Sequence, residues 1–152
     1  MREEKVDVYL VHVDGALWPC PECGKKLPAY DHKDARVWRH LDTMAFQTWV
    51  HARPPRVECP DHGVRQAGVS WAESNSRFTK FFERFAIDVA RETDTKGAGK
   101  ILKLSWDGVW GVQERAVARG LRAKPPVALR FMGVDEKAVG HGHQYATIVY
   151  NL

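Results

Sequence analysis

The sequence predicts an α+β protein in three parts: a small β-rich module over residues 1–66, a helical segment over 77–124 and a β-hairpin over 130–152. β-branched and aromatic residues are concentrated in the first and last parts, as is typical of strands. Between these parts, apolar residues recur at helical spacing. The 152 residues have a hydrophobic fraction of 44%, which is enough to bury a core and excludes wholesale disorder.

The N-terminal module is expected to contain several short strands. Residues 6–13 are rich in valine and predict the first strand, and residues 36–41 and 44–51 predict two more. Pro54-Pro55 ends the last of these strands, because proline supplies no N–H to a sheet. A short strand over 56–58 then leads into Cys59.

Two pairs of potential metal ligands flank these strands. Cys20 and Cys23 form a CxxC pair, and Cys59 and His62 form a CxxH pair. Side chains three positions apart on a tight turn can face one ion, and two such pairs complete the tetrahedron that Zn²⁺ prefers. Thiolate also favours zinc over hard cations. The spacing therefore predicts a structural zinc that ties the ends of the sheet together, with no open position for catalysis.

The cysteines leave other interpretations open. They could be buried free thiols with His62 on the surface, or the CxxC pair could be a redox pair. His32, His40 and His51 are possible substitutes for His62, although none has a partner at comparable spacing. Three cysteines cannot form a closed disulfide framework, and no signal peptide is readable, so a reducing cytoplasm is expected. The apolar runs are far shorter than the roughly 18 residues of a membrane span, so no membrane contact is expected.

The helical segment follows a polar connection over residues 67–76. Ser76 or Thr79 is expected to cap the first helix. A second, weaker helix is expected over 95–104, where Gly97 and Gly99 lower the helical propensity. The first helix is predicted from an apolar stripe of about three turns, which consists of Phe78, Phe81, Phe82, Phe85 and Val89.

A third helix is expected to begin after the capping residue Ser105 and to end near Pro125-Pro126. On it, Arg115, Arg119 and Arg122 are spaced i, i+4 and i+7 and form a basic stripe. The stripe lies largely away from the predicted inner face, which consists of Trp106, Val109, Trp110, Val117 and Leu121.

Positive charge is concentrated in this part of the chain. Residues 77–130 carry 12 basic and 6 acidic side chains, whereas the whole chain has a net charge of +4. Such clustering is typical of proteins that bind a polyanion. Three helices with a short turn before the last suit a helix-turn-helix, which places its last helix in the DNA major groove. We therefore expect Arg115, Arg119 and Arg122 to contact double-stranded DNA; the alternative is a helical bundle with a solvated arginine face.

The C-terminal part is expected to be a hairpin of strands over 130–137 and 144–151, joined by a turn at 140–143. Asp135 directly follows the apolar residues of its first strand. In nucleases and polynucleotidyl transferases of the RNase H-like fold, an acid on the first strand helps to hold two Mg²⁺ ions. Taken alone, an acidic pair at a strand end is more commonly only solvated, so the motif by itself is a weak indication of a metal site.

Short motifs from about residue 20 to the C-terminus, in matching order, carry a family resemblance. Besides the four ligand positions, they are Arg39–Thr43, His51–Arg53, Pro55–Val57, Cys59–Val64, Trp71–Glu73, Ser76–Thr79, Leu104–Asp107, Glu114–Leu121 and Gly133–Lys137. In these motifs the chain resembles the ISL3 family of insertion-sequence transposases.

The resemblance implies an N-terminal zinc-binding segment, a helix-turn-helix for the terminal inverted repeats of the element and an RNase H-like catalytic domain of the DDE type. It implies that Asp135 is the first acid of the DDE triad and that His143 and Tyr145 begin the second strand of that domain. It also implies that the protein forms a homo-oligomer within a transposition complex.

The chain ends at Leu152, where the resembling enzymes continue, so the second Asp and the final Glu of the triad are absent from this sequence. One carboxylate cannot hold two Mg²⁺ ions. We therefore expect a DNA-binding part of a transposase with an incomplete RNase H-like hairpin, for which Mg²⁺ matters only in the complete catalytic domain. Two alternatives are a stand-alone zinc-containing DNA-binding regulator, which competes with the full-length transposase, and a folding-defective remnant.

Overall fold

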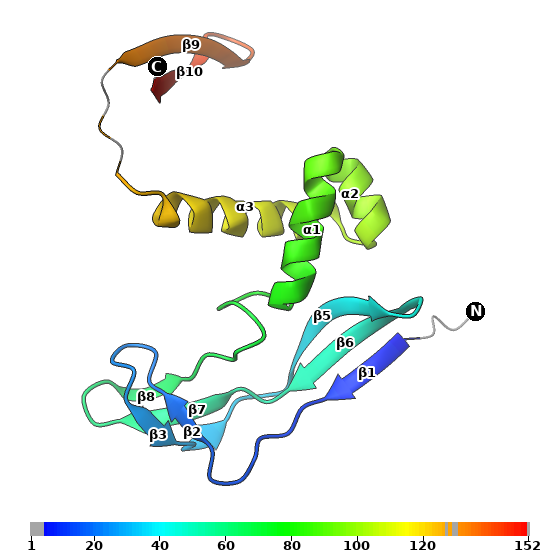
Figure 1. Cartoon of the computed structure of the whole chain (residues 1–152), viewed down its shortest axis with the longest axis vertical. Helices are drawn as coiled ribbons and strands as arrows, with labels where there is room; N and C mark the ends of the chain where they lie inside the picture. Colours follow the sequence, from blue (N-terminus) through cyan, green and yellow to red (C-terminus); the bar gives the residue numbers. More distant parts are fainter. Residues whose placement is uncertain (1–4, 127, 129–130, 152) are drawn as a thin grey trace. The chain divides into compact units, whose positions relative to one another are not determined.

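The computed structural model describes residues 5–126, 128 and 131–151 (Figure 1). Their elements are of the predicted α+β class: short strands first, then helices, then a hairpin. The chain divides into two compact units, residues 1–116 and 117–152, and the boundary falls inside the third helix.

The first sheet contains both strands predicted over 36–41 and 44–51. They form an antiparallel hairpin that turns at Met44, whose φ is +57°. A parallel strand joins the other side of the hairpin. It is shorter than the predicted strand over 6–13, because the backbone N–H of Leu10 makes a last bond to the His51 carbonyl at 2.8 Å and the chain then leaves the sheet. In sheet order the strands are β1 (Lys5–Tyr9), β6 (Phe46–Ala52) and β5 (Arg36–Thr43).

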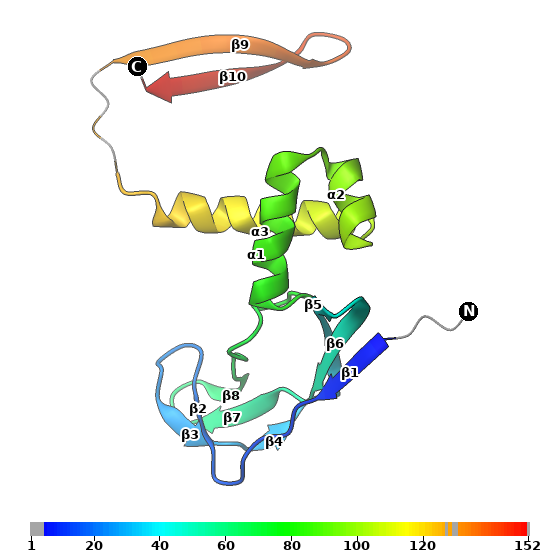
Figure 2. The ribbon, with the colours of Figure 1, turned by 45° about the vertical axis from the view of Figure 1, so that its right-hand side comes forward.

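A second group of strands surrounds the predicted metal ligands. It consists of an antiparallel hairpin and a three-stranded antiparallel sheet, which lie side by side in both views (Figures 1 and 2). The strand predicted over 56–58 is confirmed, and it extends by one residue at each end. The hairpin strands are β2 (Leu17–Pro19) and β3 (Lys26–Pro28), and the sheet strands are β4 (Asp31–His32), β7 (Pro55–Cys59) and β8 (Gly63–Gln66).

The backbone of β5 fixes the start of the helical segment. The Arg39 amide donates to the Arg77 carbonyl at 2.9 Å, and the Thr79 amide donates to the Arg39 carbonyl at 3.0 Å. Trp38, the residue before Arg39 on β5, is buried, and its ring meets that of Trp71 edge to face, with 5.8 Å between ring centroids. The polar connection over 67–76 is therefore packed on the first sheet.

Three helices follow, as predicted: α1 (Lys80–Glu92), α2 (Thr95–Leu102) and α3 (Trp106–Ala123). Thr79, one of the two expected capping residues, caps α1 by accepting a hydrogen bond from the Phe82 amide at 3.3 Å. Asp94 caps α2 in the same way, and the Ser105 hydroxyl accepts from the Gly108 amide at 3.2 Å, as expected for α3. The three helices share one core, made of Phe78, Phe82, Ala86, Ala98, Leu102, Val109 and Val112.

The predicted inner face of α3 is wrong at four of its five positions. Val109 is buried, but Trp106, Trp110, Val117 and Leu121 are each more than half exposed. The face that packs inward instead carries the small residues Gly108, Val109 and Val112. The surface of α2 that these residues meet is small as well: a Cβ added at Gly99 would lie 3.0 Å from the Leu104 carbonyl oxygen of the turn and 3.9 Å from a Val109 methyl group. The larger residues therefore remain outside.

The same correction applies to α1. Of its predicted apolar stripe, Phe78 and Phe82 are buried, and their rings stack at 5.3 Å between centroids. Phe81 and Phe85 are exposed. Ala86 and the charged residue Glu83 take the buried positions beside Phe82.

The second unit contains the predicted hairpin, formed by β9 (Met132–Gly140) and β10 (Gln144–Asn151). Asp135 pairs in register with Ile148. The first strand begins at Met132 rather than at residue 130, which lies outside the described residues. Among the described residues, none of the three helices combines the length and the apolar character that crossing a membrane requires.

Candidate functional site

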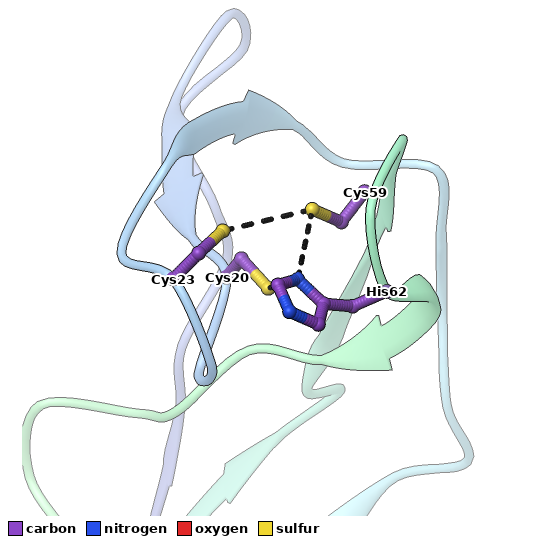
Figure 3. Close-up of side chains that lie close together, drawn as sticks. All are labelled: Cys20, Cys23, Cys59 and His62. Atoms are coloured by element: carbon purple, nitrogen blue, oxygen red, sulfur yellow. Dashed lines mark hydrogen bonds between the residues drawn. The ribbon is translucent and has the colours of Figure 1, made fainter.

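The CxxC and CxxH pairs converge in space. The Sγ atoms of Cys20, Cys23 and Cys59 and a ring nitrogen of His62 all lie within 4.8 Å of one another (Figure 3). Cys23 Sγ is 3.7 Å from Cys59 Sγ, and His62 Nδ1 is 3.5 Å from Cys59 Sγ and 3.9 Å from Cys20 Sγ. The four predicted ligands, which come from two segments about 40 residues apart, therefore surround one point.

These distances fit a tetrahedral zinc. With Zn–S bonds of about 2.3 Å and a Zn–N bond of about 2.0 Å, the edges of the tetrahedron are about 3.8 Å between sulfurs and about 3.5 Å between sulfur and nitrogen. The Cys23–Cys59 and Cys59–His62 distances equal these values within about 0.1 Å. The widest separation has to shorten by at most about 1.3 Å to reach the ideal edge. Three thiolates and one imidazole are a donor set typical of structural zinc.

The backbone of both turns is shaped for this convergence. Gly24 and Gly63 follow the last ligand of each pair with φ of +73° and +67°, a conformation that glycine adopts without strain. The Gly24 amide donates to the Cys20 carbonyl at 2.9 Å, and the Cys20 amide donates to the Lys25 carbonyl at the same distance. Each turn thus folds back on itself and directs its two ligand side chains inward.

The side chains influence the protonation of one another. The hydrogen bond with His62 lowers the pKa of the Cys59 thiol to about 6, and the same bond raises the pKa of His62. For Cys23, the bond from the Lys25 backbone lowers the pKa, but burial and the neighbouring Cys59 and Cys20 thiols outweigh it and raise the pKa. Because metal ligation needs thiolates and neutral imidazole, zinc binding releases protons from this cluster.

Glu22 and Arg65 lie directly behind the cluster. Glu22 is inside the CxxC turn, and its carboxylate is 3.7 Å from His62 Nε2, the ring nitrogen that faces away from the thiols. The Arg65 guanidinium of β8 donates to Glu22 at 2.5 Å, and this bond lowers the pKa of the Glu22 carboxyl. At 3.7 Å this contact is an ion pair and not a hydrogen bond, so Glu22 acts on His62 through its charge; a carboxylate near the second nitrogen of a zinc-ligating histidine is a common arrangement.

The alternative histidine ligands have other contacts. His40 Nδ1 lies 2.7 Å from the Thr79 hydroxyl, and His51 Nε2 lies 2.7 Å from Asp7 Oδ1. His32 stacks on His12 at 5.1 Å between ring centroids. The structure therefore brings His62, and none of the three substitutes, to the thiols.

The second candidate site is the helix-turn-helix formed by α2 and α3. The turn between them passes through Lys103, whose φ of +55° is left-handed and reverses the chain after α2. The Lys103 and Leu104 amides both close the turn onto Gly99, the latter at 2.9 Å. Val109 and Val112 of α3 then pack on Ala98 and Leu102 of α2, so that the opposite side of α3 faces outward.

Of the predicted DNA-contacting arginines, Arg115 has a partner inside the protein. Its Nε donates to Glu83 Oε1 of α1 at 2.8 Å, and Glu83 is only 2% exposed. Glu83 also accepts from the Ser76 hydroxyl at 2.7 Å. Arg119 is half-buried, whereas Arg122 is exposed, with its Nε on the Ala118 carbonyl at 3.2 Å. The prediction that these arginines contact DNA stays a prediction, and Arg115 also joins α1 to α3.

Asp135, the candidate Mg²⁺ ligand, is exposed on β9, and its Oδ1 accepts from the Glu136 amide at 2.9 Å. Within the described residues, the Cys/His cluster is the one group of three or more potential metal ligands that come together. Asp135 is therefore not part of an acidic cluster among these residues.

Models of known protein families match the segments that form the metal cluster and the helix-turn-helix. A model of the zinc-finger of transposase IS204/IS1001/IS1096/IS1165 matches residues 16–62, which include all four ligands, and a model of the helix-turn-helix domain of transposase family ISL3 matches residues 69–117. Together they cover more than half of the chain. The chain belongs to the ISL3 transposase family. The family resemblance of the sequence motifs is thereby confirmed.

Relatives of this family align over most of the chain. The chain is 30% identical over 132 residues to the transposase for insertion sequence element IS1557 of Mycobacterium tuberculosis, and 21% identical over 131 residues to that for IS1001 of Bordetella parapertussis. Each alignment covers 86% of this chain, but the chain spans only 30% and 32% of the length of these two relatives. No solved structure matches the chain.

Sequence reasoning missed two groups of functional residues. Glu22 and Arg65 could have been suspected, because an acid inside a CxxC turn and a base shortly after a CxxH turn must lie near the ligands. Glu83 carries a weaker signal: it is adjacent to Phe82 and occupies a core-facing position of α1. Nothing in the pattern showed that Trp106 and Trp110 would be exposed.

Proposed function

We propose that the chain is the part of an insertion-sequence transposase that binds double-stranded DNA, and that the terminal inverted repeats of the element are its target. The observation that carries this proposal is the outward face of α3, which is uncovered in a helix-turn-helix within the most basic part of the chain. This function places the chain in the cytoplasm, together with the DNA.

In the same proposal, the zinc is structural. Cys20, Cys23, Cys59 and His62 hold it with four protein ligands, so no coordination position remains for a substrate. The ion stabilises the ribbon of β2, β3, β7 and β8, whose own core consists of Cys20, Val57, Cys59 and Ala67 with Trp18 and Leu27 beside them. So small a core needs the metal, because it buries little apolar surface.

The catalytic part of the proposal concerns the complete enzyme. There, metal-dependent phosphodiester cleavage and strand transfer would use Asp135 as one ligand of a pair of Mg²⁺ ions. In the chain itself Asp135 is exposed and outside any acidic cluster of the described residues, and one carboxylate is too few for two ions. We infer that the 152-residue chain binds DNA without cutting it and that oligomers form in the complete transposition complex.

An alternative function is a stand-alone, zinc-containing DNA-binding regulator that competes with a full-length transposase for its DNA ends. The observation that favours it is the kind of module that matches: a zinc finger over residues 16–62 and a helix-turn-helix over 69–117, which bind DNA without a catalytic domain in other contexts. The two functions differ in whether this polypeptide acts as part of an enzyme.

Competition binding tests the proposal. Fluorescence anisotropy is measured with a labelled duplex from one end of the element, against unlabelled end duplex and a scrambled duplex of equal composition. Specific proteins prefer their sites by at least about 10³-fold, and a preference of that order supports the proposed target. Equal competition by both duplexes would refute it.

A nicking assay with supercoiled plasmid and Mg²⁺ tests the catalytic inference separately. The purified chain should leave the plasmid intact, and metal-dependent nicking by it would contradict the inference. If the chain also lowers the activity of an added full-length transposase on the same ends, the regulator is the better description.

A further inference from the structure

Two tryptophans lie exposed at the beginning of α3, on the side that faces away from the core. Trp106 and Trp110 are 55% and 51% exposed, and their rings stack nearly parallel, with 5.3 Å between centroids. They are one helical turn apart, whereas Val109 and Val112 face the core. In a helix-turn-helix, the N-terminal residues of the second helix reach the base edges. The indole pair therefore occupies the position from which bases are read.

We infer that Trp106 and Trp110 are the base-reading residues of this chain, and that they recognise thymine through its 5-methyl group in the major groove. This inference rests on the proposed DNA binding and deepens it. The thymine methyl is the apolar group that base edges present in the major groove. An indole offers a large apolar surface and one N–H donor, which suits a methyl group better than it suits the acceptors of guanine.

Lysines beside the pair provide the complementary charge for DNA. Lys96 and Lys100 of α2 line a shallow hollow of about 220 Å³ together with Trp106, and both lysines are exposed. Neither is in an ion pair with another described residue. Lys103, in the turn, is also exposed. Phosphates border the major groove, so the lysines can contact the DNA backbone while the tryptophans face the bases. Such phosphate contacts position the helix, and the base contacts specify the sequence.

Acidic residues on α3 support the same orientation. Asp107 and Glu114 are exposed next to the tryptophan pair. Carboxylates repel phosphates, but they accept hydrogen bonds from the amino group of cytosine in the groove. A helix that presents indoles and carboxylates therefore matches a pyrimidine-containing strand on the floor of the groove, with the lysines on the backbone.

Removing only the methyl group tests this inference. The full chain is titrated with four labelled duplexes: alternating dA-dT, the same duplex with uracil in place of thymine, alternating dG-dC, and the same duplex with 5-methylcytosine. Burying one methyl group is worth about fourfold in affinity. If two indoles each cover one methyl group, replacing thymine with uracil should lower the affinity on the order of tenfold. Replacing cytosine with 5-methylcytosine should raise the affinity, because it adds the methyl group.

Variants locate the effect. The double variant W106A/W110A should bind the thymine and uracil duplexes equally, and each single variant should keep a ratio of only about fourfold. F81A, which removes an exposed aromatic residue on α1, should keep the wild-type ratio. Circular dichroism and zinc content check that each variant is folded. Both tryptophans are exposed, so neither substitution opens a cavity in the core.

The outcomes of these titrations distinguish the methyl inference from the proposed DNA binding. Salt-dependent duplex binding with no difference between thymine and uracil would overturn the methyl inference and leave the proposed function standing. Absence of binding to any duplex would overturn both. If the two substitutions leave DNA binding unchanged but convert a dimer to a monomer in sedimentation, the pair contacts a second copy of the chain, and the inference is wrong.

Discussion

The ion pair between Glu83 and Arg115 predicts a stability effect that separates structural from DNA-binding arginines. Glu83 is 2% exposed and accepts from Arg115 Nε at 2.8 Å. Removing one partner of a buried pair costs about 3–5 kcal/mol, because the other charge stays buried. The Arg115 side chain is 30% exposed, so solvent screening lowers this to about 2–3 kcal/mol. R115A should therefore lower the free energy of unfolding by about that amount.

Urea unfolding of the zinc-loaded chain, followed by circular dichroism, measures this change. R122A is the matched control: Arg122 is the same residue type on the same helix, it is exposed, and its Nε donates to the Ala118 carbonyl of its own helix. It should change the free energy of unfolding by less than about 0.5 kcal/mol. In the double-mutant cycle with E83Q, the coupling energy should be on the order of 1–3 kcal/mol. An R115A protein as stable as R122A, with no coupling to Glu83, would refute the assignment of Arg115 as the link between α1 and α3.

Three further predictions concern the metal centre and the helix cap. Metal analysis should return about one zinc per chain, and a chelator should unfold the β2–β3 and β7–β8 ribbon; a chain that stays fully folded without metal would contradict the structural role. E22Q should weaken zinc binding about tenfold in a competition titration with a chromophoric chelator, because it removes the negative charge beside His62. An unchanged affinity would mean that the Glu22 charge has no influence on His62 as a ligand. T79A should lower the stability by about 1 kcal/mol in urea unfolding because the Phe82 amide loses its cap, and no loss would argue against Thr79 as the N-cap.

The metal centre was predictable from the sequence because its geometry is local. In each pair, two ligands three positions apart are brought together by a turn that the chain closes itself, and Gly24 and Gly63 permit the positive φ. The choice of His62 over other histidines followed from the same spacing. The Glu22–His62 contact was harder to predict from the sequence, because it depends on how the two turns face each other.

The orientation of α3 was not predictable from periodicity alone. Its sequence carries two stripes that could pack: a large one with Trp106 and Trp110, and a small one with Gly108, Val109 and Val112. Counting apolar side chains predicts that the stripe of large residues packs inward. The fold selects the small one, since Val109 and Val112 share one core with Phe82 and Ala86 of α1 and with Ala98 and Leu102 of α2. That packing depends on which residues of α1 and α2 meet α3, and the α3 segment alone does not contain this information.

The C-terminal hairpin and the helix caps were predictable in part. Strands β9 and β10 were predicted from β-branched residues around a glycine-rich turn, and both are present. Ser76 was weighed as an N-cap against Thr79; in the structure Thr79 caps α1, while the Ser76 hydroxyl bonds to the buried Glu83. The role of Ser76 required a partner seven residues away, which capping rules do not consider.

The measurement that tests the central claim most directly is the salt dependence of duplex binding by the intact chain and by K96Q/K100Q. If the outward side of α2 and α3 meets the DNA backbone, log K falls steeply with log salt concentration, and loss of two phosphate contacts reduces the slope by about 2. An unchanged slope, with wild-type affinity, would show that DNA binds elsewhere on the chain or that the lysines beside Trp106 have no part in binding it.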